Sequence, residues 1–287
     1  MSDRIESEAG PTEAPSDDDG EDTVRTEEWR AVLTGTDPSM IRLRKIWGRV
    51  PSSPRCKFCA SPFKGPGRVL TRLIMHGQSN QNPLFCNACF SALGKRPGGA
   101  EVEISVLFAD VRGSTGLAEQ TTAARFRDLI QEFYRTTSGA IDRNGGLIDK
   151  FMGDGVMALF IPIIAGEDHA ARAIQAGEDV LAAARSPRLT EGGVRVGVGV
   201  HWGPAFVGTV GSGDRLDFSA LGDTVNIAAR LGSVAGPGEL VVSRVAWDHT
   251  ERGVDGVDAR SIPISGRTTG LDVIVASERR GVAAPST

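Results

Sequence analysis

The sequence predicts an α+β fold, preceded by a small module that contains all four cysteines of the chain. Beyond residue 100, short runs of alternating apolar residues are interleaved with longer segments in which apolar residues recur at helical spacing. Before residue 100, the cysteines form two Cys-x-x-Cys pairs. We expect four parts, namely a disordered acidic tail, a helical segment with the cysteine module, the main domain and a short C-terminal tail, at 1–26, 27–99, 100–279 and 280–287.

The bulk composition excludes several classes of protein. Hydrophobic residues make up 40% of the chain and charged residues 24%, which suits an ordinary globular core. The formal net charge of -4 does not favour nucleic acid as a partner. The acidic start, MSDRIESEAG, lacks the apolar segment of a signal peptide, and the longest apolar stretch, Val156–Ala165, is far shorter than the ~20 residues of a membrane helix. We therefore expect a soluble, cytoplasmic protein with no membrane or nucleic-acid partner.

The segment before the first cysteine changes character near residue 27. Residues 1–26 carry Asp17-Asp18-Asp19 among Gly, Pro and Ser, and such a segment cannot bury enough apolar surface to offset its ordering entropy. Residues 27–48 place apolar side chains among Arg and Lys in a helical pattern that Pro38 interrupts. Helical structure is therefore expected only from residue 27 onward.

The two cysteine pairs are Cys56-x-x-Cys59 and Cys86-x-x-Cys89. Together they supply four sulfurs, the preferred tetrahedral shell of structural zinc, although the gap between the pairs is longer than in a zinc ribbon. An iron or iron–sulfur centre is the second interpretation, and disulfides are the third, since a cytosolic chain is kept reduced. His76 lies between the pairs and is expected to be an ordinary polar residue, because the cysteines already complete the shell. Four phenylalanines fit a small core around the ion: Phe58, Phe63, Phe85 and Phe90.

The main domain follows a linker expected at 97–100 (PGGA). Its expected elements, in chain order, are a strand ending at Asp110, a helix with core residues from Leu117 to Ile141, strands at Leu147–Met152 and Val156–Ile161, a helix at about 167–185, and strands at 193–203 and 205–211. The order strand, helix, strand, strand, helix, strand is the ferredoxin-like βαββαβ arrangement. It places the first strand beside the hairpin at the centre of the sheet.

Two acidic residues are therefore expected to meet. Asp110 ends the first strand, and Asp154 sits at the hairpin tip in Gly153-Asp154-Gly155. Two carboxylates repel each other unless a cation lies between them, and Mg²⁺ binds through one or two carboxylates together with substrate phosphates. The turn that follows the first strand leads into a helix N-terminus and offers backbone N–H groups to those phosphates, from Gly113, Ser114 and Thr115.

Three segments resemble the signature blocks of class III nucleotidyl cyclases: LFADVRGSTGL, GGLIDKFMGDGVMALF and LGDTVNIAARL. The resemblance covers about residues 101–276. It implies an enzyme that makes a cyclic nucleotide and pyrophosphate from a nucleoside triphosphate with two Mg²⁺ or Mn²⁺ ions per site. It also implies a head-to-tail dimer with active sites across the interface.

The resemblance assigns the metal ligands. Asp110 and Asp154 match the two metal-binding aspartates, and Val111 would contribute a backbone oxygen. One ion would lower the pKa of the ribose 3′-hydroxyl, and the other would clamp the triphosphate and stabilise the leaving pyrophosphate. No protein nucleophile is required.

The resemblance also assigns the residues that read the base. Lys150 matches the base-selecting lysine, and Ser219, seven residues before Asn226, matches the second position. An ammonium can donate to adenine N1, whereas guanine N1–H is a donor and would clash. Guanylyl cyclases of the family typically carry Glu in place of the lysine. The pair therefore favours ATP, with the serine less decisive because its hydroxyl can also donate.

Asn226 and Arg230 lie four residues apart, on one face of a helix. They match the residues that orient the ribose and stabilise charge on the phosphates. Asp223, just before them, is expected only to favour the helix N-terminus. The family often has a C-terminal lysine that contacts the terminal phosphates; here Ser265 falls on that position and Arg267 is the nearest cation.

The sequence thus predicts an ATP-specific adenylyl cyclase that acts as a homodimer and is regulated or supported by its four-cysteine module. Two alternatives remain open at this stage: a guanylyl cyclase, which Lys150 argues against, and a metal- or redox-sensing protein whose cyclase domain is only a scaffold. A diguanylate cyclase would carry a Gly-Gly-acid-acid-Phe hairpin, which Gly153-Asp154-Gly155 is not.

Overall fold

The computed structural model describes residues 17–65, 67–74, 76–212, 215–253, 257–263 and 270–277. Its helices are α1 (Asp17–Thr34), α2 (Pro38–Gly48), α3 (Gly67–Leu73), α4 (Asn87–Lys95), α5 (Ser114–Gln120), α6 (Ala123–Arg143), α7 (Pro162–Ala165), α8 (His169–Ala184), α9 (Pro187–Thr190), α10 (Asp223–Val234) and α11 (Arg244–Asp248). Its strands are β1 (Gly99–Val111), β2 (Leu147–Met152), β3 (Gly155–Phe160), β4 (Val196–Ser212), β5 (Arg215–Leu221), β6 (Glu239–Ser243), β7 (Asp258–Ile262) and β8 (Leu271–Ser277). None of the described helices is long and apolar enough to span a membrane.

The strands form one eight-stranded sheet in the order β2-β3-β1-β4-β6-β8-β7, with β5 paired to β4. β1 lies between β3 and β4 and is antiparallel to both. The elements β1, α6, β2, β3, α8 and β4 follow one another as the ferredoxin-like arrangement requires, so the expected fold class is confirmed. The hairpin therefore lies beside the first strand, as expected.

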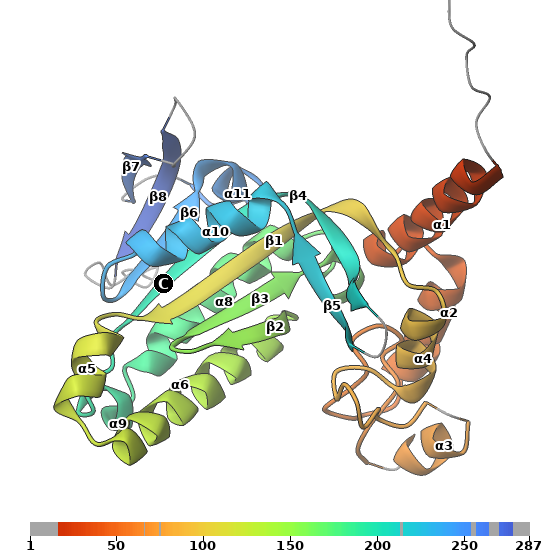
Figure 1. The fold of residues 1–287 in the computed structure, drawn as a ribbon, viewed down its shortest axis with the longest axis horizontal. Coiled ribbons are helices and arrows are strands. Elements are labelled where there is room, and N and C mark those ends of the chain that lie inside the picture. The colour runs from red at the N-terminus through yellow and green to blue at the C-terminus, as the bar shows by residue number, and fades with distance from the viewer. Residues whose placement is uncertain are drawn as a thin grey trace, which may run out of the picture.

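Both faces of the sheet are covered by helices (Figure 1). Alternate side chains of β1 point to opposite faces, so Leu107 and Ala109 join the core under α6 and α8, while Ile104 and Val106 join the core under α1 and α10. α10 approaches β4 closely, because a Cβ atom at Gly199 would lie only 2.1 Å from the backbone N of Gly232. These glycines let α10 lie directly on the sheet.

The segment expected as two strands, at 193–203 and 205–211, is a single strand, β4. Pro204 lies within it, where a strand break was expected. The long partner explains the difference: β1 pairs with β4 continuously, from Gly99 opposite Gly208 to Val111 opposite Val196. β5, which the sequence reading did not include, then folds back on the far end of β4.

The expected linker at 97–100 is shorter than predicted, because Gly99 and Ala100 already belong to β1. Two glycines on the paired strands, Gly99 of β1 and Gly208 of β4, permit the close approach of the backbones. A Cβ atom at Gly99 would lie 2.4 Å from the carbonyl oxygen of Val207, and one at Gly208 would lie 2.2 Å from the oxygen of Gly98. Only residues 96–98 therefore separate α4 of the cysteine module from β1.

The region around Leu117–Ile141 also differs in detail from the expectation of one helix. It contains two helices, α5 and α6, separated where the Thr122 side chain accepts a hydrogen bond from the backbone N of Arg125. The apolar residues of α6 pack into the core as expected.

The disorder expected for 1–26 does not hold for its second part. Residues 17–26 are the first turns of α1, whereas residues 1–16 lie outside the described residues. Arg25 and Asp22 form an exposed ion pair at 3.1 Å in this part of α1, and farther along the helix the side chains of Trp29 and Leu33 pack against the same core as β1. The core contacts of α1 thus lie beyond residue 26, and residues 17–26 extend a helix that packs through Trp29 and Leu33.

Candidate active site

The two acidic residues of the predicted metal site meet at one corner of the sheet. Asp110 pairs with Gly155 across β1 and β3, and the backbone N–H of Val111 donates to the carbonyl oxygen of Asp154 at 3.0 Å. A side chain at position 155 would begin 3.4 Å from Asp110 Oδ1, so glycine keeps this corner open. The carboxylates of Asp110 and Asp154 and the Val111 carbonyl are hard oxygen donors, which fit Mg²⁺ or Mn²⁺.

Arg112 is a cation at this corner to which the sequence reading assigned no role. Its guanidinium forms an ion pair with Asp110 Oδ2, and its Nη1 donates to the Ser233 carbonyl at the end of α10 at 2.9 Å. Burial lowers the pKa of Arg112, and the nearby charge of Asp154 acts in the opposite direction. A metal ion would compete with Arg112 for the Asp110 carboxylate.

The hairpin tip is held from the helical side by Tyr134 of α6, the only tyrosine in the chain. Its hydroxyl donates to the carbonyl oxygen of Gly153 at 2.5 Å, and its ring packs on Phe151 with the centroids 4.4 Å apart. Burial raises the pKa of this phenol, and the charge of Asp154 adds to the effect. The sequence signal was weak: Tyr134 follows Phe133 in a helix whose apolar pattern indicates only core packing.

Lys150 and Ser219, assigned to base reading, lie in direct contact although they are far apart in the chain. Lys150 Nζ donates to Ser219 Oγ at 3.2 Å. A third residue, Asp149, joins them: its Oδ2 is 3.1 Å from Lys150 Nζ and accepts a hydrogen bond from Ser219 Oγ at 2.9 Å. The sequence reading missed Asp149, because alternation in β2 would place it on the face opposite Lys150.

A β-bulge explains the contact. The register between β2 and β3 shifts between Ile148 and Lys150, which lets two successive side chains reach the same partner. The side chain of Asp149 is completely buried, whereas that of Lys150 is 43% exposed. Burial raises the pKa of Asp149, and the Lys150 ammonium and the Ser219 hydroxyl oppose this effect.

Asn226 and Arg230 lie on the exposed face of α10, and Ile227, Ala228 and Leu231 form its buried face. No hydrogen bond or ion pair joins these two side chains to the acidic pair within the described residues. Gly113 has a left-handed backbone (φ 69°) and leads into α5, which begins with Ser114 and Thr115. Ser265 and Arg267 lie outside the described residues.

Residues 99–273, more than half of the chain, match the family model described as the adenylate and guanylate cyclase catalytic domain. The chain belongs to this family. The cyclase domain is 35% identical over 134 residues to an adenylate cyclase of Anabaena cylindrica, a match that covers 45% of this chain and 26% of that protein. Adenylate cyclase 1 of Rhizobium meliloti is 33% identical over 134 residues, or 45% of this chain and 20% of that protein. The chain thus spans about a quarter or less of these curated relatives.

Solved structures show the same fold. The guanylyl cyclase Cya2 superposes with a TM-score of 0.58 at 26% identity, over 62% of this chain and 93% of that one. The adenylyl cyclase CyaB of P. aeruginosa superposes with a TM-score of 0.57 at 27% identity, over 64% and 99%. One neighbour is a guanylyl cyclase and the other an adenylyl cyclase, so the choice of base depends on residues of this chain.

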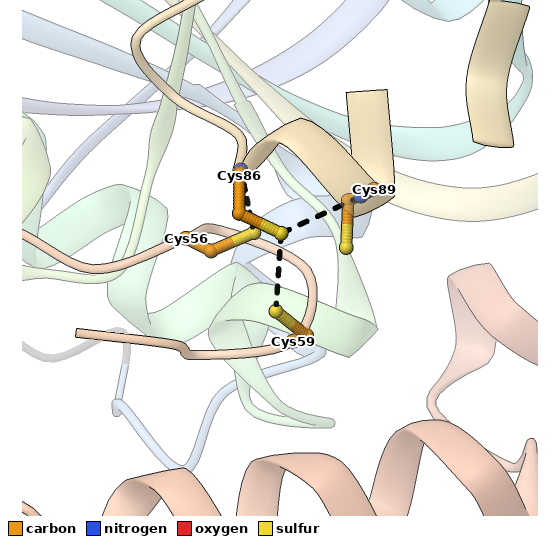
Figure 2. A group of neighbouring side chains, drawn as sticks. All are labelled: Cys56, Cys59, Cys86 and Cys89. Carbon is orange, nitrogen blue, oxygen red and sulfur yellow. Dashed lines mark hydrogen bonds between the residues drawn. The ribbon is translucent and has the colours of Figure 1, made fainter. Parts of the chain in front are cut away.

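The four cysteines outside the cyclase domain converge as expected. Their sulfur atoms all lie within 4.8 Å of one another and all four residues are buried (Figure 2). Backbone N–H groups support the sulfurs: that of Cys86 donates to Cys56 Sγ at 3.3 Å, and that of Cys89 donates to Cys86 Sγ at 3.4 Å. Cys86 also caps the N-terminus of α4, a position that favours a thiolate.

The cysteines perturb one another because they are buried together. Hydrogen bonds from the neighbouring thiols, Cys56 first among them, lower the pKa of Cys59, and a hydrogen bond from Cys56 lowers the pKa of Cys86 to about 6. Hydrogen bonding to the neighbouring sulfurs and burial raise the pKa of Cys56 and of Cys89. A cation bound between the four sulfurs would favour the ionised form of every cysteine.

His76, expected from the sequence to be an ordinary polar residue, directly contacts the cysteine cluster. Its Nδ1 lies 3.4 Å from Cys86 Sγ and 3.7 Å from Cys59 Sγ. Burial lowers the pKa of His76, but the contacts with these two sulfurs outweigh burial and raise the pKa overall. His76 lies beside the four-sulfur set as a hydrogen-bond partner.

The cysteine module packs against β5, the strand that carries Ser219. Phe58 lies within the first Cys-x-x-Cys pair, and Phe85 directly precedes the second. Both rings contact Phe218 edge-on, with centroid distances of 5.2 and 5.7 Å. Trp29 of α1 stacks on the same ring at 6.5 Å. Figure 1 shows α1–α4 gathered beside β5 at one end of the sheet. Phe218 is the neighbour of Ser219, so the module contacts β5 directly beside the residue assigned to base reading.

The module also holds the strand that carries Lys150. Lys57 Nζ donates to Asp142 Oδ1 and to the Gly146 carbonyl, both at 2.8 Å. Gly146 directly precedes β2. Residues of the first Cys-x-x-Cys pair thus contact both β5, through Phe58, and the segment that leads into β2, through Lys57.

Proposed function

We propose that this protein is an adenylyl cyclase, which converts ATP to 3′,5′-cyclic AMP and pyrophosphate. The contact between Lys150 and Ser219 carries this proposal. The Lys150 ammonium can donate to adenine N1, and Ser219 can accept from the adenine amino group. A guanylyl cyclase would need the opposite polarity at the first of these positions.

Each residue assigned to the site has a defined part in the proposed reaction. Asp110, Val111 and Asp154 would hold two Mg²⁺ or Mn²⁺ ions. When bound, these ions would lower the pKa of the ribose 3′-hydroxyl and stabilise the negative charge on the leaving pyrophosphate. Asn226 orients the ribose, and Arg230 stabilises the charge that develops on the phosphates. The backbone N–H groups of residues 113–115 bind the triphosphate, with Arg267 assigned to its terminal phosphate.

The active form is a homodimer in which two copies share each site. Asn226 and Arg230 are exposed, with no bond to the acidic pair within the described residues of their own chain. Exposed apolar side chains surround the base-reading strands, with Phe151 49%, Met152 39% and Leu221 50% exposed. A second copy would cover these residues and bring its Asp110 and Asp154 opposite Lys150, Ser219 and the exposed face of α10.

The four cysteines hold one zinc ion in a closed structural site. Four buried sulfurs with backbone N–H support and no open position fit zinc, and an iron–sulfur cluster is the alternative. The ion keeps the module folded, and the module keeps β5 and β2 in the positions that the base requires. We propose that regulation of the enzyme passes through these contacts.

The reaction is tested by offering ATP and GTP separately to the full chain with Mn²⁺. The expected product is cyclic AMP from ATP, with kcat/KM for GTP lower by at least about 100-fold, because the unmatched hydrogen bonds of guanine would be buried. The matched variant is Lys150→Glu, which should shift the preference toward GTP. Product from GTP alone would identify a guanylyl cyclase, and product from neither nucleotide would support the scaffold alternative.

The brace between the module and β2 is tested by Lys57→Ala. Loss of its two hydrogen bonds should lower cyclic AMP formation by about tenfold, because only part of the roughly 1.5–3 kcal/mol that such a bond contributes to stability would be lost from the transition state. Zinc content should stay unchanged, since Lys57 is not a ligand. Arg96→Ala is the matched control, because it removes a cation of the N-terminal region that only pairs with exposed Glu28 at 3.4 Å. Equal activity of both variants would contradict the brace.

A further inference from the structure

Asp149 lies at the centre of the base-reading contacts without a role in the function proposed above. Its side chain is completely buried, and one oxygen, Oδ2, receives both the Ser219 hydroxyl at 2.9 Å and the Lys150 ammonium at 3.1 Å. Its other oxygen, Oδ1, is buried and has no hydrogen-bond partner among the described residues. A buried carboxylate with one unsatisfied oxygen costs free energy, so stability alone does not explain an acid at this position.

The contacts fix which hydrogen-bonding groups remain for a ligand. A serine hydroxyl has one hydrogen to donate and two lone pairs. Ser219 donates its hydrogen to Asp149 and accepts from Lys150, so only one lone pair is left. Lys150 has three hydrogens, and two are directed at Asp149 and Ser219, so one is left. The pair therefore presents one acceptor and one donor.

These two groups match adenine and mismatch guanine. Adenine carries a donating amino group at C6 beside the acceptor N1, whereas guanine carries the acceptor O6 beside the donor N1–H. To bind guanine, Ser219 would have to turn its hydrogen toward O6 and give up its bond to Asp149. The serine is ambiguous by itself, and the aspartate removes the ambiguity.

We propose that Asp149 is a positioning residue that sets the Ser219 hydroxyl as an acceptor and thereby makes the pocket selective for adenine over guanine. This inference rests on the proposed adenylyl cyclase function, because it concerns the same site. It assigns the selectivity to three residues, with Asp149 acting on the nucleotide only through Ser219 and Lys150. The β-bulge in β2 is the backbone feature that makes the arrangement available.

Asp149→Asn tests the proposal in the full-length protein. The amide has nearly the same shape, but its NH₂ group can donate to Ser219 and release the hydroxyl hydrogen toward guanine O6. The ratio of kcat/KM for ATP to that for GTP should fall by about 10- to 100-fold. KM for ATP should rise more than kcat falls, because the base is bound equally in the ground state and the transition state.

Two further variants separate this role from a structural one. Asp258→Asn removes an exposed carboxylate from β7, at the opposite edge of the sheet from β2, and should leave the ATP/GTP ratio unchanged. Asp149→Asn in a Ser219→Ala background should produce no further fall in the ratio, because the hydroxyl that Asp149 orients is absent. A loss of activity equal for both nucleotides, or an effect of Asp149→Asn that persists without the hydroxyl, would overturn the proposal.

The outcomes distinguish this inference from the function on which it rests. A wild-type protein that prefers ATP, together with an Asp149→Asn variant of unchanged ratio, overturns the role of Asp149 alone. A wild-type protein that prefers GTP, or that converts neither nucleotide, overturns the proposed function and the inference with it.

Discussion

Asp154→Ala is expected to lower cyclic AMP formation by about 10³-fold. The substitution removes a ligand of the metal ions, which stabilise the transition state by several kcal/mol. Arg230→Ala should lower the rate of cyclic AMP formation by about 10²- to 10³-fold, because the charge on the phosphates would lose its stabilising partner.

An equal mixture of the two inactive proteins should recover about one quarter of wild-type activity. About half of the dimers would be mixed, and each mixed dimer would have one intact site of two. The measurement is the rate of cyclic AMP formation before and after mixing.

The control for this mixture is Asp154→Ala combined with Asp110→Ala, which damages the same half of the site in both chains. That mixture should stay inactive at every ratio and concentration. Full activity in either single variant would contradict the assigned roles. Recovery in neither mixture, with both variants folded and dimeric, would show that each chain contains its own complete site.

Cys89→Ser is expected to remove the bound metal and to lower the free energy of unfolding by about 5 kcal/mol or more, since metal binding to a four-thiolate site is coupled to folding. The loss should extend to the sheet, because the cysteines share one hydrophobic core with β1 and with Phe218 of β5. The measurements are metal content per chain and the thermal midpoint with and without a chelator. Activity should fall in parallel with metal content.

His76→Ala is the matched control for the cysteine variant. It removes a hydrogen-bond partner of Cys59 and Cys86 without removing a sulfur, so metal content should be retained. If metal analysis of the wild-type protein finds iron together with acid-labile sulfide, the bound group is an iron–sulfur cluster and not zinc. A wild-type chain with no metal, whose thermal midpoint is indifferent to the chelator, would contradict a metal site of either kind.

Part of the candidate site could be predicted from the sequence because it lies in short local patterns. Asp110 ends an alternating strand and Asp154 lies between two glycines, so a strand beside a hairpin suffices to bring them together. The two Cys-x-x-Cys pairs specify a four-sulfur cluster in the same way, because each pair is a single local turn. Such patterns depend on neighbouring residues and not on the rest of the fold.

Other site residues could not be predicted, because their roles arise from contacts between distant segments. Tyr134 reaches the hairpin tip only because α6 packs alongside β2. Asp149 joins Lys150 and Ser219 only because a β-bulge interrupts the alternation of β2. Phe218 gains its importance from two phenylalanines that lie more than a hundred residues earlier in the chain.

The sequence by itself determined the α+β class, the βαββαβ order that begins the main domain, the acidic corner and the cysteine cluster, because each depends on periodicity or spacing within a few residues. The tertiary structure alone decided that β4 continues through Pro204 and that the cysteine module is built onto β5. These features depend on which surfaces are buried together. Burial between distant segments is a property of the folded chain as a whole, so no local pattern reports it.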